Sequence, residues 1–268
     1  MPYNTRYFLL FLGLAVVTLI SVNLHFPTPA GKADILIISP HPDDAVLCCT
    51  GLILQALGQK KRVHIVEMTD GDGYADAAAL LAKKSAGLLT LIDMRRLGRV
   101  RKHEEILAMQ TLGLNRNHIT FLGYPDGWLD EVYNAEDTPF RSPFTELSRS
   151  ASSDTLYIKS SVIADLTSII ARYAPTHVYV SGNFDSALDH RVTYKFVTDA
   201  VKISGYTGKL FMYANHTTDS GTLLPEYELT LTREQKQAKA AAITAYTSQL
   251  PLDGDYLRSF AGTKELFY

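Results

Sequence analysis

Hydrophobic residues fall into short runs that alternate with longer stretches of helical length. The short runs predict buried β-strands, because strands of a parallel sheet are covered on both faces and read as continuous apolar segments. These predicted strands are residues 34–39, 62–68, 119–122, 176–181 and 209–213. The intervening stretches predict helices over residues 44–57, 74–89, 100–112, 162–173, 191–203 and 232–248. This alternation predicts an α/β, Rossmann-like fold, with a mostly parallel sheet and helices on both faces.

The first 32 residues have a different character from the rest. The run from Tyr7 to Val22 carries no charge and follows Arg6. This pattern fits a cleaved signal peptide or a single membrane anchor, although its 16 residues are fewer than the roughly 20 of a typical span. A buried core helix is a third interpretation, but no capping residue or polar face supports it. We therefore expect residues 1–32 to be a signal peptide or membrane anchor with a short linker, and residues 33–268 to be exported.

Charge and cysteine content exclude some classes of protein. The 26 Lys and Arg residues nearly balance the 28 Asp and Glu residues, and this near-neutral chain gives no reason to expect a nucleic-acid partner. The two cysteines, Cys48 and Cys49, are adjacent within a predicted helix. That spacing supports neither a disulfide framework nor a zinc ribbon, so we interpret both as small buried hydrophobic residues.

Ionisable and small residues gather in loops that follow the predicted strands. Four such loops are residues 40–44, 69–76, 123–129 and 182–190. In open α/β sheets, ligands bind beyond the carboxyl ends of the strands, so these loops predict one site at a shared sheet edge. The long polar stretch 130–153 is expected to cross the same functional face.

The first of these loops has the sequence Pro40-His41-Pro42-Asp43-Asp44. His41 and Asp44 are three residues apart at a strand-to-helix junction, so both side chains can turn toward one point. Histidine and carboxylate are ligand types of catalytic zinc, and Asp43 could accept a proton from water held there. The alternative is that the two aspartates only cap the next helix.

The pair Asp189-His190 follows the fourth predicted strand. His190 can supply a third protein ligand, and Asp189 could orient that histidine or the substrate. Two loops of this kind on one sheet edge favour a metal site over a helix cap.

These motifs resemble the PIG-L/LmbE-like de-N-acetylase family, whose members use zinc to remove acetyl from N-acetylglucosaminyl groups. The resemblance extends over residues 33–268. It rests on the His-Pro-Asp-Asp motif, on Asp189-His190-Arg191 and on several further positions. Those are Thr69-Asp70-Gly71, Arg101, Glu104, Ala108, Leu112-Gly113, Lys239, Tyr246, Gln249, Phe260-Ala261 and Glu265-Leu266-Phe267.

The resemblance implies a de-N-acetylase-like catalytic domain with one zinc ion per chain. His41, Asp44 and His190 would be its ligands, and Asp43 would be the general base.

For the substrate, the resemblance implies that Arg101 holds a hydroxyl or phosphate and that Asp126 lines the sugar pocket. Asp70, like Asp126, is expected to contact the substrate. Without the family, Arg101 would read as part of a solvated helix face, and Asp126 with Gly127 as an ordinary turn.

Two positions depart from the family pattern. Ala45 stands where the family usually has glutamate, and Ala187 stands where it often has a histidine thought to stabilise the tetrahedral oxyanion. Loss of one oxyanion donor typically lowers a rate by about 10²–10³-fold. His216, just past the fifth predicted strand, is the candidate substitute.

The main hypothesis is therefore a zinc-dependent deacetylase of a small-molecule, glycolipid or polysaccharide substrate. Membrane association is expected if the N-terminal segment is retained. The alternative is a membrane-tethered, non-catalytic binder of sugars or lipid headgroups that keeps the metal site. A phosphoesterase is disfavoured, because the sequence offers ligands for only one metal ion.

Overall fold

The computed structural model describes residues 33–216, 223–262 and 264–268. The signal peptide or anchor expected at residues 1–32 lies outside these ranges. Within them, no helix is both long enough and apolar enough to cross a membrane.

Five parallel strands form the central sheet, in the order β3-β2-β1-β4-β5. The strands are β1 Ile35–Ser39, β2 Val63–Thr69, β3 Ile119–Tyr124, β4 His177–Ser181 and β5 Lys209–Tyr213. Each lies within two residues of its predicted position. The observed sheet confirms the predicted Rossmann-like α/β fold.

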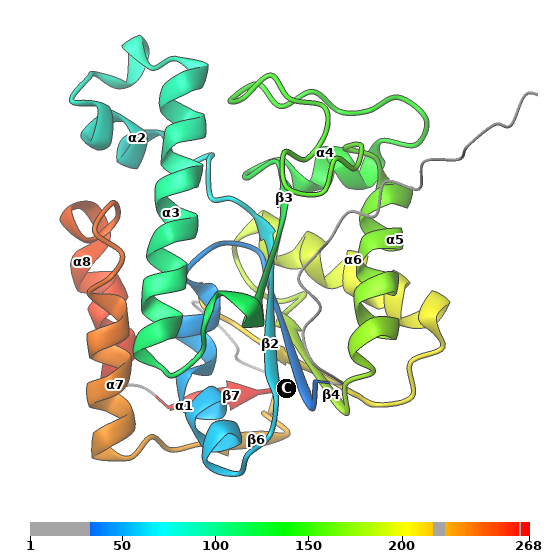
Figure 1. Ribbon diagram of the computed structural model, residues 1–268, viewed down its shortest axis with the longest axis vertical. Helices are drawn as coiled ribbons and strands as arrows, with labels where there is room; N and C mark the ends of the chain where they lie inside the picture. The colour runs from blue at the N-terminus through cyan, green and yellow to red at the C-terminus, as the bar shows by residue number, and fades with distance from the viewer. Residues whose placement is uncertain (1–32, 217–222, 263) are drawn as a thin grey trace, which may run out of the picture.

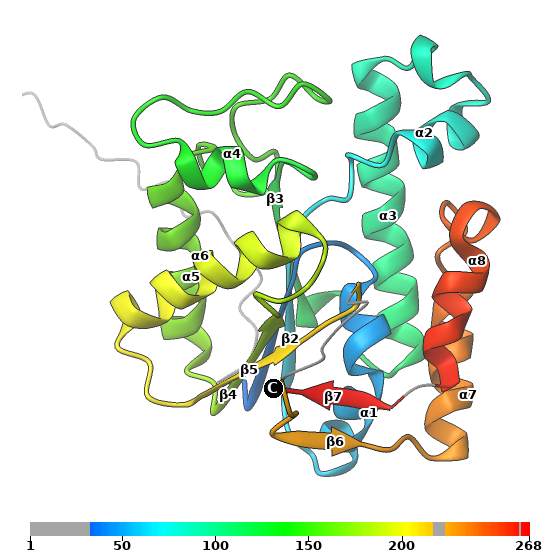
Figure 2. The ribbon, with the colours of Figure 1, turned by 180° about the vertical axis from the view of Figure 1, so that it is seen from behind.

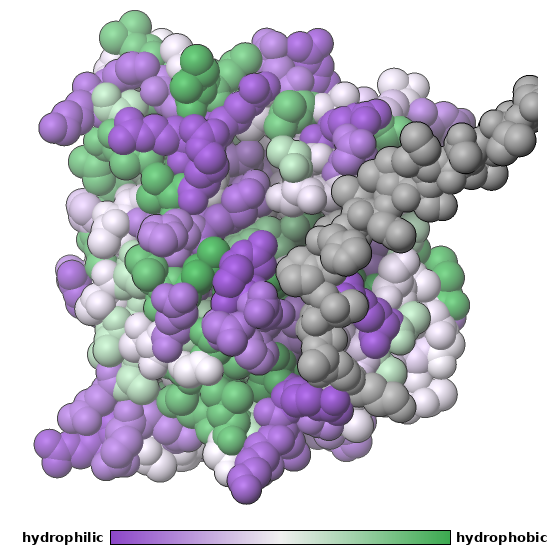
Figure 3. Space-filling view, in the orientation of Figure 1, coloured by the Kyte–Doolittle hydropathy of each residue, from purple (hydrophilic) through white to green (hydrophobic). Residues whose placement is uncertain are grey.

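Helices cover both faces of the sheet (Figures 1 and 2). One face carries α1 Asp44–Gly58, α3 Leu91–Thr111, α7 Arg233–Ile243 and α8 Leu250–Ser259, and the other carries α4 Leu129–Asn134, α5 Lys159–Tyr173 and α6 Leu188–Ser204. Successive strand residues feed opposite cores: Ile35 and Ile37 pack toward α1, while Leu36 and Ile38 pack toward α5 and α6. On the face drawn in Figure 3, hydrophilic and hydrophobic residues are mixed over the coloured surface.

The five helices predicted up to residue 203 are all present but wrong at several ends, and the short helix α4 at Leu129–Asn134 was not predicted. The stretch predicted as one helix over 74–89 ends as α2 Ala75–Ala82, because Lys83 takes a left-handed conformation with φ of 55°. Helix α3 begins at Leu91, nine residues before the predicted start, because Thr90 and Asp93 form a capping box there. Cys48 and Cys49 are buried in α1, as expected.

The C-terminal part contains elements that the sequence did not predict. The helix expected over 232–248 ends at Ile243, and α8 follows it with non-helical backbone angles at Asp253. Two short antiparallel strands, β6 Tyr227–Leu229 and β7 Glu265–Phe267, form a second sheet.

A buried ion pair fastens the C-terminus to α1, the helix that begins at Asp44. Glu265 on β7 accepts hydrogen bonds from the backbone N–H groups of Gly51 and Leu52, at 2.8 and 3.0 Å. The Nζ atom of Lys239 on α7 lies 3.0 Å from the same carboxylate, and both side chains are buried.

We expect Lys239→Met to lower the free energy of unfolding by about 3 kcal/mol, because it leaves the Glu265 carboxylate buried without its cation. The matched control is Lys264→Met, which breaks a surface pair with Glu228 and should cost about 0–1 kcal/mol. Urea denaturation measures both. Equal effects would show that the buried pair has no special role.

Candidate metal centre

The site lies at the switch point of the sheet: the chain adds strands on one side of β1 up to β3, and then on the other side from β4. Strands β1 and β4 are neighbours, but β1 leads into α1 on one face and β4 leads into α6 on the other. The crevice beyond the carboxyl ends of such a pair is the usual ligand site of an open α/β sheet. His41 follows β1 and His190 lies in the first turn of α6, so the two predicted loops meet here.

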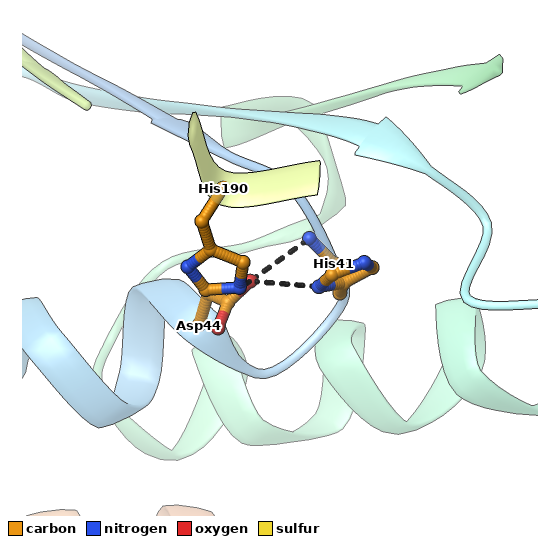
Figure 4. Close-up of side chains that lie close together, drawn as sticks. All are labelled: His41, Asp44 and His190. Atoms are coloured by element: carbon orange, nitrogen blue, oxygen red, sulfur yellow. Dashed lines mark hydrogen bonds and ion pairs between the residues drawn. The ribbon is translucent and has the colours of Figure 1, made fainter. Parts of the chain in front are cut away.

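The three predicted ligands come together around one carboxylate oxygen (Figure 4). Asp44 Oδ2 lies 3.2 Å from His41 Nδ1 and 3.3 Å from His190 Nε2. Zinc–ligand bonds of about 2.0–2.2 Å in a tetrahedral site place ligand atoms about 3.3–3.6 Å apart, so the two distances to Asp44 lie at or just below the short end of the range for a zinc ion. Asp44 and His190 are buried and His41 is half-buried, which leaves one side of the group accessible.

Each ligand histidine also has a carboxylate behind it. His41 Nε2 lies 3.0 Å from Asp126 Oδ1 and 3.4 Å from Asp189 Oδ2, and His190 Nδ1 lies 3.1 Å from Asp185 Oδ2. Carboxylates in this position fix the ring orientation and increase the basicity of the ligating nitrogen.

This arrangement refines the sequence interpretation of Asp189. Its carboxylate orients His41 rather than the adjacent His190, and it also accepts the N–H groups of Gly127 and Leu129. The residue that supports His190 is Asp185, which the sequence reasoning missed. Its position in the already suspected loop 182–190 was the available signal.

The surrounding carboxylates give the site a negative electrostatic field. Burial lowers the pKa of His190, but Asp44 and Asp185 outweigh it and raise that pKa to about 9. Burial also lowers the pKa of His41, and carboxylates, with Asp126 foremost, raise it well above its usual value. The field therefore stabilises positive charge between the two rings, carried by protons or by a metal cation.

Asp43 does not cap α1, so the capping alternative is wrong. Its side chain makes no cap hydrogen bond, and its φ of 144° is a strained value for a residue with a Cβ. Instead its carboxylate accepts hydrogen bonds from Arg101 Nη2 at 3.1 Å and from Gln249 Nε2 at 2.5 Å. Burial raises the pKa of Asp43, while the neighbouring Arg101 opposes that rise.

Arg101 is buried against the loops rather than exposed on a helix face. Its guanidinium also donates to the carbonyl groups of Gly71 and Pro42, both at 3.1 Å. Gly71 has φ of 69°, and a Cβ there would lie 2.5 Å from Arg101 Nη1, so the loop requires glycine.

Asp70 does not join the group. Its carboxylate pairs with Lys102 Nζ at 2.6 Å, and it is not one of the described residues that line the pocket beside the metal ligands.

That pocket has a volume of about 490 Å³. Its described lining residues are His41, Asp43, Asp44, Leu47, Gly73, Tyr74, Arg101, Asp126, His216, Gln249, Asp253, Tyr256 and Leu257. The last four come from the segment after residue 248, where the sequence predicted neither α8 nor a site residue. The predicted residues Asp126 and His216 do line the pocket.

His216 occupies the side of the pocket next to His190. The two rings are 4.8 Å apart between centroids, and the hydroxyl of Tyr256 lies 2.8 Å from His216 Nδ1. Ala187 lies nearby at the N-cap of α6, and the hydroxyl of its neighbour Ser186 donates to the carbonyl of His216.

Comparison with protein families identifies the chain. The model described as PIG-L, GlcNAc-PI de-N-acetylase, matches residues 36–201, which is more than half of the sequence. The fold and the site together define an α/β protein with a His-Asp-His group that can hold a metal ion. The chain belongs to the PIG-L family, and its members are N-deacetylases, hydrolases that act on amide bonds. No curated protein sequence matches it.

Solved structures share the fold. The N,N'-diacetylchitobiose deacetylase of Pyrococcus horikoshii is 22% identical, with 92% of this chain and 86% of that chain covered and a TM-score of 0.61. The zinc-inhibited form of teicoplanin deacetylase is 18% identical, with 85% and 89% covered and a TM-score of 0.54. The 4-carboxy-2-hydroxymuconate hydratase of Pseudomonas putida is 19% identical, with 86% and 82% covered and a TM-score of 0.60. Deacetylases and a hydratase thus share this architecture, so the fold alone does not select the reaction.

We expect Asp185→Asn to weaken zinc binding by about 10- to 100-fold, because the amide supports His190 less strongly than the carboxylate does. Competition with a chromophoric chelator measures the affinity. Asp199→Asn is the control, since Asp199 accepts a hydrogen bond from Tyr133 and does not support a metal-binding histidine. Identical affinities for the two variants would contradict the supporting role.

Proposed function

We propose that this protein is a zinc-dependent amidohydrolase that removes an N-acetyl group from an N-acetylglucosaminyl-type sugar or glycolipid. One observation carries the proposal: in a PIG-L family chain, the buried, strained Asp43 lines the same pocket as His41 and Asp44 of the His-Asp-His group. The names of the similar chitobiose and teicoplanin deacetylases support the reaction and the sugar substrate.

Zinc is the metal that the ligand set suits best, because two histidines and one carboxylate are a common catalytic zinc set with one position left open. When bound, the ion supplies a Lewis acid to the attacking water and to the acetyl carbonyl.

Asp43 is the residue placed to move the proton. It accepts a proton from the water as the water oxygen bonds to the acetyl carbon, and it returns that proton to the leaving nitrogen as the C–N bond breaks. The products are acetate and a free amine. Arg101 and Gln249 both donate to Oδ2 of Asp43, so we assign Arg101 first to the positioning of Asp43. Contact of Arg101 and Asp126 with the substrate remains part of the proposal.

His216 is the proposed oxyanion donor in place of the family's histidine at Ala187. The Tyr256 hydroxyl donates to the carbonyl of Asn215, so it accepts a hydrogen bond from His216 Nδ1, and Nε2 acts as an oxyanion donor in the form of the ring that carries a proton on both nitrogens. Packing against His190 brings this ring beside the metal ligands.

The N-terminal sequence supports export of the domain. We infer that the uncharged run from Tyr7 to Val22 either anchors the protein in a membrane or is removed as a signal peptide. Mass spectrometry of the mature N-terminus distinguishes the two: a start near residue 30 indicates cleavage, and an intact first residue indicates an anchor. A native, untagged protein recovered intact from the cytoplasm would contradict export.

We expect Asp43→Asn to abolish acetate release from an N-acetylglucosaminide, because asparagine cannot accept the proton. Zinc should still bind at one ion per chain. Acetate release by zinc-loaded protein, followed by a coupled acetate assay, tests this. Release that survives the substitution would overturn the base assignment, whereas wild-type protein that binds sugar without releasing acetate would favour the non-catalytic binder.

We expect His216→Ala to lower kcat by about 10²–10³-fold with little change in KM, because the donor acts mainly on the developing oxyanion. Ala187→His in the His216→Ala background should restore part of kcat by returning a histidine to the family position. Tyr256→Phe, which removes the partner of Nδ1, should have a smaller effect. An unchanged kcat in His216→Ala would exclude the residue from the reaction.

A further inference from the structure

The outer wall of the pocket is built by residues far apart in sequence. Tyr74, in the loop before α2, donates its hydroxyl to Asp253 Oδ2 on α8 at 2.5 Å. Tyr256, one turn further along α8, stacks on His216 with ring planes 14° apart. Helices α2 and α8 lie on the same side of the sheet in both ribbon views (Figures 1 and 2). Tyr74, Asp253 and Tyr256 line the same pocket as His41 and Asp44, so this wall is available to the part of a substrate next to the acetylated sugar.

Carboxylates dominate the charge around the pocket. Four of them line it, on Asp43, Asp44, Asp126 and Asp253. Arg101 is the one Lys or Arg among the described lining residues, and its guanidinium already faces Asp43 at 3.1 Å and Asp126 at 3.8 Å. A divalent ion would offset only part of the negative charge, since Asp185 and Asp189 stand directly behind the ligand histidines.

The polar atoms left for a ligand are mainly acceptors. Gln249 donates a hydrogen bond from Nε2 to Asp43, and its Oε1 is buried with no hydrogen-bond partner among the described residues. The unpartnered Arg101 Nε is a donor, but it lies against Gly71, 2.8 Å from the position of a Cβ there, and so faces the loop. A buried acceptor without a donor is costly, so a ligand that brings N–H, O–H or ammonium groups is favoured.

We propose that Asp253, held by Tyr74, selects substrates in which the sugar next to the N-acetyl group is neutral or carries an amine, and disfavours substrates with a phosphate at that place. The inference rests on the proposed deacetylase function. It distinguishes a chitin-like or partly deacetylated oligosaccharide from a phosphoinositide-type glycolipid, because a phosphate would face Asp253 with no free cation on the described wall.

The test compares four compounds on the zinc-loaded protein. Two are disaccharides, N,N'-diacetylchitobiose and the same disaccharide with a free amine on the second sugar. The other two are N-acetylglucosamine 1-phosphate and the methyl glycoside of N-acetylglucosamine. We expect kcat/KM to be about fivefold higher for the amine than for the neutral disaccharide. The phosphate should be at least about tenfold poorer than a neutral methyl glycoside of the same sugar. Both differences should shrink in 1 M salt, where the Debye length is about 3 Å.

Asp253→Asn is the diagnostic variant. It should remove most of the preference for the amine and reduce the penalty on the phosphate, so that the kcat/KM values of the charged compounds move toward those of their neutral counterparts. Asp255→Asn is the matched control, because Asp255 lies on the same helix but is fully exposed, and it should leave the order unchanged.

Two outcomes would overturn the inference. One is a phosphate substrate used as well as the neutral one, and the other is an Asp253→Asn variant that lowers all substrates equally. Absence of acetate release from every compound would instead refute the proposed function. The same compounds would then be ranked by Kd in calorimetry, where the same order supports the charge selection and a preference for phosphate refutes it.

Discussion

The site depends on the contacts of one buried carboxylate, that of Asp44 at the junction of β1 and α1, with two histidines. One of its oxygens faces both His41 and His190, which arrive from strands on opposite sides of the switch point. Burial of a carboxylate costs several kcal/mol unless positive charge and hydrogen bonds offset it. Asp126, Asp185 and Asp189 add to that cost, so the site is stable only with protons or a cation between the rings. The same requirement is one that a metal ion can meet.

Asp43 shows how the surrounding structure supports this centre. Its backbone is strained, and the strain persists because Arg101 from α3 and Gln249 from the start of α8 hold its carboxylate. Gln249 lies beyond residue 201, where the family match ends. The C-terminal segment therefore completes the pocket, and the buried Lys239–Glu265 pair ties that segment to the helix that begins at Asp44.

The sequence predicted what strong local patterns encode. Buried parallel strands are apolar on both faces, so all five were found, and the strand-end loops correctly brought His41, Asp44 and His190 together. Local patterns do not encode long-range pairing. Asp189 turned out to support His41, 148 residues away, because that pairing depends on how the loops after β1, β3 and β4 converge.

Helix α8 was missed for a different reason. Gly254 is a weak helix former within it, the backbone at Asp253 is non-helical, and Pro251 is tolerated only because it stands in the first turn. Because the sequence did not predict α8, it also did not predict that Asp253 and Tyr256 form the outer wall of the pocket. The sequence thus located the His41, Asp44 and His190 group better than the residues of the outer wall.

The most direct test of the account is a zinc titration of metal-free protein with acetate release from an N-acetylglucosaminide as the readout. Activity should rise in proportion to zinc and reach its maximum at one ion per chain, since the described residues bring His41, Asp44 and His190 to a single point. Full activity without zinc, or no activity with one zinc bound per chain, would contradict it.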